Sequence, residues 1–227
     1  MSRLPKLFIF DLDGVITDTA EFHYLAWKQL AEELGITIDR EFNETLKGVS
    51  RMDSLERILA LKPSLKDMPL EEKERLAAKK NDHYLQFIQT ITPEHVLPGI
   101  IKLLDNIKEN NIQIALGSAS KNAPMVLKYL QVTDYFDYVV DAAKVKRGKP
   151  DPETFTTAAD HFGIPYAECI GLEDSQAGIE AINRAGMYSV GIGPESSLSE
   201  ANYLVPRTED LDFHKIIEEY KKSHVHS

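Results

Sequence analysis

The 227-residue sequence predicts an α/β protein that is built on a parallel sheet and carries a helical insert. Short apolar runs alternate with helical patterns from about residue 98 onward, as repeated strand–helix–strand units do. One further apolar run, residues 7–10, precedes a long segment that has helical patterns but no convincing strand. The hydrophobic share of 43% and the charged share of 27% are those of an ordinary globular protein.

The first run, residues 7–10, is typical of a buried parallel strand because it is continuously apolar and leads directly into Asp11. Apolar side chains then recur at helical spacing as far as Gly35, which predicts a helix with a stop signal. Two further helices are predicted at about 52–61 and 69–89, in stretches rich in Glu and Lys. The segment after the first strand is therefore expected to be entirely helical.

The alternation of strands and helices begins after Pro98 and Gly99. Strands are predicted at 112–117, 138–140, 169–172 and 187–192, and helices at about 100–110, 122–130, 152–162, 175–185 and 209–222. This order predicts a Rossmann-like parallel sheet core, made of residues 1–16 and 95–227, with an inserted α-helical cap domain at residues 17–94.

The charge balance argues against two classes of partner. Lys and Arg total 26 and Asp and Glu total 36, so the formal net charge is −10. A protein this acidic is a poor general partner for nucleic acid or an anionic membrane, and neither is expected. No apolar run approaches the ~18 residues of a membrane span, and residues 1–10 do not have the pattern of a signal peptide.

The single cysteine, Cys169, excludes an internal disulfide and favours a reducing cytoplasm. It is expected to be a small buried apolar residue rather than a catalytic thiol, because no histidine accompanies it. We expect a monomer, since the insert is expected to cover the ligand-binding end of the sheet rather than a partner. His224 and His226 are expected to be solvated rather than to bind a metal.

Polar and charged side chains follow four of the predicted strands. They are Asp11 and Asp13 after the first, Ser118 to Asn122 after the second, Lys149 in the loop after the third, and Glu173 and Asp174 after the fourth. Any one of them could be only a helix cap or a solvated charge. Together they meet where the carboxyl ends of parallel strands bind ligands. Four crowded carboxylates need a cation such as Mg²⁺, and a hydroxyl and a lysine beside it form a phosphoryl site.

These segments resemble the four motifs of the haloacid dehalogenase-like superfamily, in the same order. The matching residues are Phe10-Asp11-Leu12-Asp13-Gly14-Val15, Ser118, Lys149-Pro150 and Glu173-Asp174. The cap segments Lys47-Gly48-Val49-Ser50-Arg51 and Lys80-Asn81, with residues 117–122 and 171–178, are similar to those of the β-phosphoglucomutase family within that superfamily.

The resemblance implies that Asp11 is a nucleophile that forms an aspartyl-phosphate and that Asp13 is the general acid and base. It implies a Mg²⁺ held by Asp11, the backbone carbonyl of Asp13, Glu173 and Asp174, and a phosphoryl group bound by Ser118, Ala119 and Lys149. The implied substrate contacts on the cap and rim are Thr19, His23, Trp27, Lys47, Gly48, Val49, Ser50, Arg51, Lys80, Ser120, Lys121 and Asn122. Arg51 and Lys80 suit a second phosphate, and His23 and Thr19 would hydrogen-bond Asp13.

The implied reaction interconverts β-D-glucose 1-phosphate and D-glucose 6-phosphate, with β-glucose 1,6-bisphosphate as intermediate and priming donor. Small sugar phosphates are thus the expected partners. A Mg²⁺-dependent sugar-phosphate phosphatase stays open, because it would use the same four motifs but pass the phosphoryl group to water. A non-catalytic phosphate-binding module is disfavoured, because it has no need of both Asp11 and Asp13.

Periodicity alone favours plainer roles for some residues. His23 has the pattern of a partly exposed helix residue, and Trp27 that of a packing residue one turn later. The loop that contains Lys146 and Arg147 is unusually basic, and both side chains are expected to be solvated.

Overall fold

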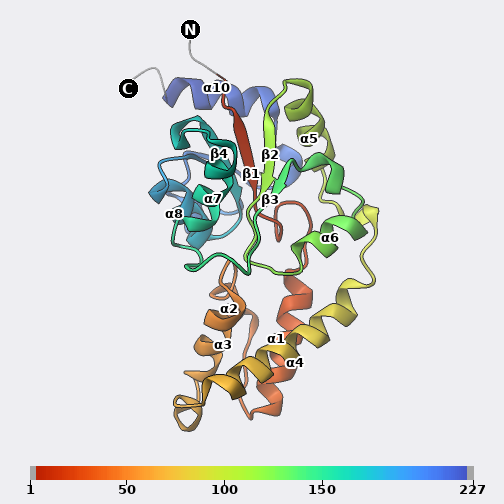
Figure 1. Ribbon diagram of the computed structural model, residues 1–227, viewed down its shortest axis with the longest axis vertical. Helices are drawn as coiled ribbons and strands as arrows, with labels where there is room; N and C mark the ends of the chain where they lie inside the picture. Colours follow the sequence, from red (N-terminus) through yellow and green to blue (C-terminus); the bar gives the residue numbers. More distant parts are fainter. Residues whose placement is uncertain (1–3, 224–227) are drawn as a thin grey trace.

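A computed structural model describes residues 4–223, and His224 and His226 lie outside that range. Six parallel strands form one sheet in the order β3-β2-β1-β4-β5-β6 (Figure 1). The strands are β1 (Leu7–Phe10), β2 (Gln113–Leu116), β3 (Tyr138–Val139), β4 (Cys169–Glu173), β5 (Tyr188–Ile192) and β6 (Tyr203–Val205). The predicted fold class is confirmed.

The register of the central strands places their carboxyl ends side by side. Phe10, the last residue of β1, pairs with Leu116 on one side and with Leu172 on the other. The residues that follow these three positions therefore emerge at one edge of the sheet. Asp11 is the first of them, and Glu173 is the last residue of β4.

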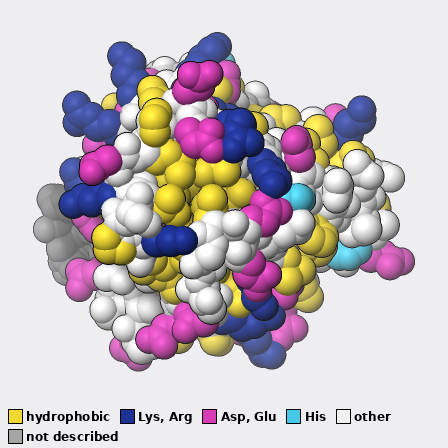
Figure 2. Space-filling view, turned by 90° about the horizontal axis from the view of Figure 1, so that it is seen from below, with side chains coloured by type: hydrophobic (Ala, Val, Ile, Leu, Met, Phe, Trp, Pro, Cys, Tyr) yellow, Lys and Arg dark blue, Asp and Glu magenta, His cyan; other side chains and the backbone are white. Residues whose placement is uncertain are grey.

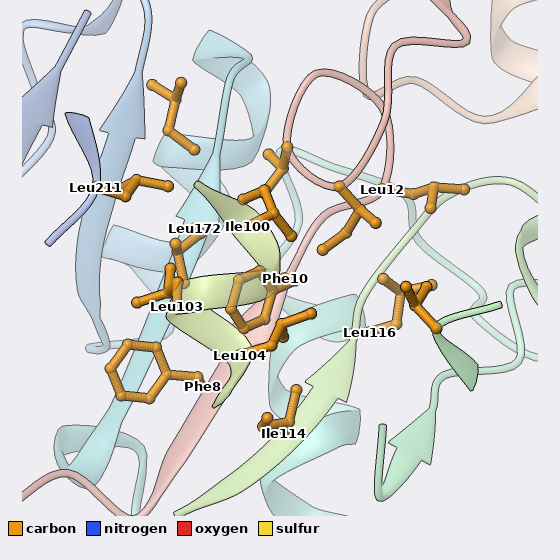
Figure 3. Close-up of a cluster of buried hydrophobic side chains, with 14 of the residues drawn as sticks. Phe8, Phe10, Leu12, Ile100, Leu103, Leu104, Ile114, Leu116, Leu172 and Leu211 are labelled. Carbon is orange, nitrogen blue, oxygen red and sulfur yellow. The ribbon is translucent and has the colours of Figure 1, made fainter. Parts of the chain in front are cut away.

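Helices cover both faces of the sheet because β1 is apolar on both. Phe8 and Phe10 pack with α5 (Ile100–Glu109), α6 (Ala123–Tyr129) and α10 (Phe213–Ser223), and Figure 3 shows part of this cluster. Leu7 and Ile9 point to the opposite face and pack with α7 (Glu153–Phe162), α8 (Gln176–Arg184) and α9 (Glu195–Leu198). This alternation is the period of two that a strand imposes.

The segment between β1 and α5 is helical, and its helices lie at one end of the sheet (Figure 1). The α-helices are α1 (Ala20–Glu33), α2 (Arg40–Glu44), α3 (Arg51–Leu59) and α4 (Leu70–Ile88). A separate apolar cluster joins them, and its buried members include Trp27, Leu55 and Leu76. The two connections to the sheet lie side by side, since the Thr17 hydroxyl donates to the His95 carbonyl at 2.7 Å. We refer to this segment as the cap.

Short 3₁₀ turns complete the described elements. They are η1 (Pro63–Leu65), η2 (Pro93–His95), η3 (Thr133–Tyr135), η4 (Tyr166–Glu168) and η5 (Thr208–Asp210). No helix among residues 4–223 is long and apolar enough to cross a membrane. Figure 2, which views the molecule from below, shows acidic and basic side chains interspersed around apolar atoms rather than a surface of one sign.

The predicted elements agree with the observed ones except in four places. β6 and the short helices α2 and α9 were not predicted, because runs of three to five residues carry little periodic signal. The last helix begins at Phe213 rather than at residue 209. The Asp212 side chain accepts a hydrogen bond from the Lys215 backbone N–H and so caps the helix at that point.

Candidate active site

Asp11 lies buried at the end of β1, in direct contact with Lys149. The Lys149 ammonium donates to Asp11 Oδ1 at 2.9 Å, to the Gly117 carbonyl at 2.9 Å and to Glu173 Oε1 at 2.5 Å. Burial alone would lower the pKa of Lys149, but the charges of Asp11 and Glu173 outweigh it and hold that pKa above its usual value. Lys149 is therefore a fixed cation beside Asp11.

The pKa of Asp11 is raised to about 7, first by burial and then by the negative charge of Glu173, while Lys149 opposes the shift. The pKa of Asp174 is also raised well above its usual range, by burial and by the charges of Glu173 and Asp11. One lysine thus does not neutralise the carboxylates collected here. The site favours the addition of a cation.

One side-chain oxygen from each of Asp11, Glu173 and Asp174 lies within 4.8 Å of the other two. Gly14 packs so closely against Asp174 that a Cβ there would lie 2.0 Å from Asp174 Oδ2. An all-oxygen donor set of this charge fits Mg²⁺, which prefers carboxylate ligands. The residues present therefore suit the divalent cation that the four motifs imply.

Glu173 has a different role from its neighbours, because both of its oxygens are already engaged. Oε1 accepts from Lys149, and Oε2 accepts from the backbone N–H groups of Asp174 and Ser175 and from the Ser175 hydroxyl. It therefore orients Lys149 and the loop that carries Asp174. Asp11 and Asp174 supply the carboxylate oxygens that are less committed.

The loop after β2 offers a hydroxyl near this cluster. Ser118 is buried, and its Oγ accepts from the Ser120 backbone N–H at 3.1 Å. Ser120 Oγ in turn accepts from the Asn122 backbone N–H at 3.3 Å. Since these bonds occupy oxygen lone pairs, the hydroxyl protons of both serines stay available for an anion.

Asp13 is held from the cap side by a chain of side chains. His23 Nε2 lies 3.3 Å from Asp13 Oδ2, and His23 Nδ1 lies 2.8 Å from the Lys80 Nζ. When Lys80 is an ammonium, which can only donate, His23 Nδ1 accepts and the proton of the neutral ring lies on Nε2, directed at Asp13. The ring also stacks on Tyr84 at a centroid distance of 4.0 Å. Thr19 is fully buried beside Tyr84, and no hydrogen bond joins it to Asp13.

Two cations of the cap lack a carboxylate partner. Within residues 4–223, neither Arg51 nor Lys80 forms an ion pair with Asp or Glu. Lys80 is buried, with its Nζ 4.7 Å from the Trp27 ring centroid and 5.0 Å from that of Tyr84. Burial and the neighbouring Arg51 charge lower the pKa of Lys80 to about 7, and burial also lowers the pKa of Arg51. An anion placed here would relieve both shifts.

A cleft of about 440 Å³ joins the two ends of this arrangement. The predicted site residues that line it are Asp11, Asp13, His23, Trp27, Lys47, Gly48, Val49, Ser50, Arg51, Lys80, Ser118, Ala119, Ser120, Lys121, Asn122 and Asp174. Thr19, Lys149 and Glu173 lie outside the lining. The lining also includes polar residues that were not predicted: Asn43, Ser54 and Glu74.

The cap loop at residues 47–51 lies directly against the core. Gly48 has φ +71°, and a Cβ on it would lie 2.7 Å from Ser175 Oγ and 3.8 Å from the Lys149 Cδ. Only glycine combines this backbone conformation with so close an approach. The cap is therefore seated over the cluster around Asp11.

Other predictions concern residues outside the cleft. Cys169 is buried, and burial raises the pKa of its thiol to about 12, which fits the predicted packing role. Lys146 and Arg147 are exposed, as predicted, while their backbone N–H groups donate to the Glu153 carboxylate. Trp27 is both buried in the apolar cluster of the cap and part of the cleft wall.

Comparison with known proteins gives a consistent result. Residues 5–186 match the family described as haloacid dehalogenase-like hydrolase. A protein of Bacillus subtilis named beta-phosphoglucomutase is 46% identical over 217 residues, which are 96% of this chain and 96% of that protein. A crystal structure of beta-phosphoglucomutase from Clostridium difficile is 50% identical, with a TM-score of 0.96 over 98% of this chain and 100% of the other.

A more distant relative bears a different activity name. The phosphorylated carbohydrates phosphatase of Thermotoga maritima is 28% identical and covers 87% of this chain and 88% of its own length. Proteins similar to most of this chain thus carry different activity names. The chain belongs to the haloacid dehalogenase-like hydrolase family.

Proposed function

We propose that this protein is a β-phosphoglucomutase that interconverts β-D-glucose 1-phosphate and D-glucose 6-phosphate. The observation that carries the proposal is a single cleft with a phosphoryl site at each end. Lys149 and Ser118 stand beside Asp11 at the core end, and Arg51 and Lys80 stand at the cap end with no carboxylate partner among residues 4–223. The identity to proteins named beta-phosphoglucomutase supports the same assignment.

The chemistry at the core end follows from the side chains present. An Asp11 oxygen forms a bond to phosphorus as the bond from phosphorus to the sugar oxygen breaks, and Asp13 gives its proton to that sugar oxygen. In the reverse half-reaction Asp13 takes the proton of the attacking sugar hydroxyl. Lys149 offsets the charge of Asp11, and Ser118 and the Ala119 N–H bind the moving phosphoryl oxygens. Bound Mg²⁺ would reduce the repulsion between carboxylate and phosphate, held by Asp11, Asp174 and the Asp13 carbonyl.

The cap end explains why two phosphates can exchange places. In the proposed cycle, β-glucose 1-phosphate accepts the phosphoryl group of Asp11 and becomes β-glucose 1,6-bisphosphate, which also primes the enzyme. The intermediate then reverses its orientation and returns its other phosphate to Asp11. The phosphate that is not being transferred is bound by Arg51 and Lys80, with Lys121 and Asn122 on the opposite rim.

A sugar-phosphate phosphatase is the second candidate, favoured by the relative from Thermotoga maritima. It would release the phosphoryl group of Asp11 to water. The cap packs against Ser175 and Lys149, which supports the mutase. A cap in this position limits the access of water to the aspartyl-phosphate and so favours attack by the sugar hydroxyl. We further infer a cytoplasmic monomer, from the single reduced cysteine and from the commitment of the cap to the cleft.

One assay separates the candidates. Purified protein with Mg²⁺, β-glucose 1-phosphate and a trace of β-glucose 1,6-bisphosphate should form glucose 6-phosphate without stoichiometric free phosphate. Release of phosphate at the rate of substrate loss would support the phosphatase. Absence of turnover with any sugar phosphate would leave a binding module. The variant Asp11→Asn should lose all turnover, and near-normal turnover would exclude Asp11 as nucleophile.

A further inference from the structure

Asn81 bridges the cap and the core at a single atom. Its Oδ1 accepts one hydrogen bond from Arg51 Nη2 at 2.8 Å and another from Asn122 Nδ2 at 2.7 Å. Arg51 begins α3 of the cap, Asn81 lies in α4, and Asn122 stands in the core loop after β2. Residues 51, 81 and 122 are thus fixed to one another although they belong to three separate segments.

The amide oxygen of Asn81 is a neutral acceptor, so it does not cancel the charge of the Arg51 guanidinium. Arg51 is half-buried and has no carboxylate partner among the described residues. A carboxylate at position 81 would neutralise the guanidinium before a substrate arrived. The amide oxygen orients Arg51 while leaving its positive charge uncompensated.

Both donors keep capacity for a further acceptor. A guanidinium has five N–H donors and an amide has two, and one donor group of each is engaged with Asn81. Arg51 and Asn122 also both line the cleft. The bridge therefore brings two sets of free N–H donors, one from each side of the cleft, to the same place.

We propose that Asn81 is a positioning residue that holds Arg51 and Asn122 together as a two-sided receptor for the phosphate that is not transferred. This inference rests on the proposed mutase function. Asn81 contributes no charge to the anion. It fixes the direction of the guanidinium, whose long side chain would otherwise adopt many rotamers, and so lowers the entropy lost when the phosphate binds.

The test compares two phosphoryl donors on the same enzyme preparation. β-Glucose 1,6-bisphosphate carries a distal phosphate, whereas acetyl phosphate delivers its only phosphoryl group to Asp11. For Asn81→Leu, we expect kcat/KM for phosphorylation of Asp11 by the bisphosphate to fall about tenfold, mainly through KM. We expect kcat/KM for phosphorylation of Asp11 by acetyl phosphate to stay within about twofold of the wild-type value. An inactive fraction of protein lowers both kcat/KM values equally and so cancels in their ratio. Asp82→Asn, an exposed change of similar size on the same helix, should leave both values unchanged.

Two further variants locate the effect. In an Arg51→Ala background, Asn81→Leu should have little additional effect on the bisphosphate reaction, because the two residues act as one unit. Asn81→Asp keeps the acceptor but pairs with Arg51, and should weaken the bisphosphate reaction at least as much as Asn81→Leu.

Three results would overturn the inference: equal losses with both donors, full additivity with Arg51→Ala, or a wild-type ratio in Asn81→Asp. Failure of the wild-type protein itself to use the bisphosphate would instead reject the proposed function, and the role of Asn81 with it.

Discussion

Asp11 should make the metal-free protein less stable as pH rises, and Asp11→Asn should remove that effect. A carboxyl group whose pKa is higher in the folded than in the unfolded protein binds protons better when folded, so it favours folding at low pH. That contribution is lost as pH rises toward the folded pKa. Asp11 is 4% exposed, and its pKa is raised from 3.8 to about 7, chiefly by burial and by Glu173.

The expected size follows from that shift. Between pH 5 and the folded pKa of about 7, the free energy of unfolding falls by about 1.4 kcal/mol for each pH unit, which gives about 3 kcal/mol by pH 8. For a chain of this length, about 3 kcal/mol corresponds to a change in melting temperature of about 6–12 °C. Asp11→Asn lacks the titration, and its amide oxygen can still accept from Lys149, which keeps Glu173 as an ionic partner.

The assay is thermal unfolding in EDTA at pH 5 and at pH 8. The difference in melting temperature between Asp11→Asn and the wild type should grow by about 6–12 °C from the lower to the higher pH. Mg²⁺ at pH 8 should stabilise the wild type more than the variant, because the variant lacks one ligand. Asp82→Asn is the control and should follow the wild type. Parallel pH profiles of Asp11→Asn and the wild type would refute the reasoning.

Three further outcomes are expected. Lys149→Met should lower kcat/KM by about 10²- to 10³-fold at saturating Mg²⁺, because it removes the cation beside Asp11, and a loss below about tenfold would contradict this role. Gly48→Ala should lower kcat/KM by about tenfold, measured in the coupled mutase assay, since its Cβ would meet Ser175 Oγ and its φ is positive; wild-type kinetics would mean that the loop is not seated as described. Cys169 should resist iodoacetamide in native protein at pH 8 and react after unfolding, and rapid labelling of the native protein would contradict its burial.

Much of the core end of the site could be predicted because topology places it. In a parallel sheet, the residue after each strand emerges at the same edge, so Asp11 and Glu173 had to meet once the strands were identified. Their chemistry is also local, since a carboxylate or a lysine has few roles at such an edge. β6 was missed because Tyr203 to Val205 is too short for a periodic pattern.

The cap end was less accessible from the sequence. Segment 80–81 could be recognised by resemblance, but the bridge from Asn81 to Asn122 spans 41 residues and depends on how the cap is seated. Asn43 and Ser54 join the cleft wall for the same reason. Neither carries a motif, and small polar residues on helices usually face water. Only the packing of α2 and α3 over the sheet places them beside the substrate space.

The separate apolar cluster of the cap has an evolutionary consequence. Its buried members all lie between Tyr24 and Ala77, whereas the layers that hold Asp11 are built from other residues. Mutations confined to this cluster can therefore reshape the cap without removing side chains from the layers that support the nucleophile. The side chains that shape the cap and those that support the phosphoryl chemistry can thus change partly independently. This division allows one reaction centre to be kept while the space for the substrate changes, and the relatives from Bacillus subtilis and Thermotoga maritima carry different activity names.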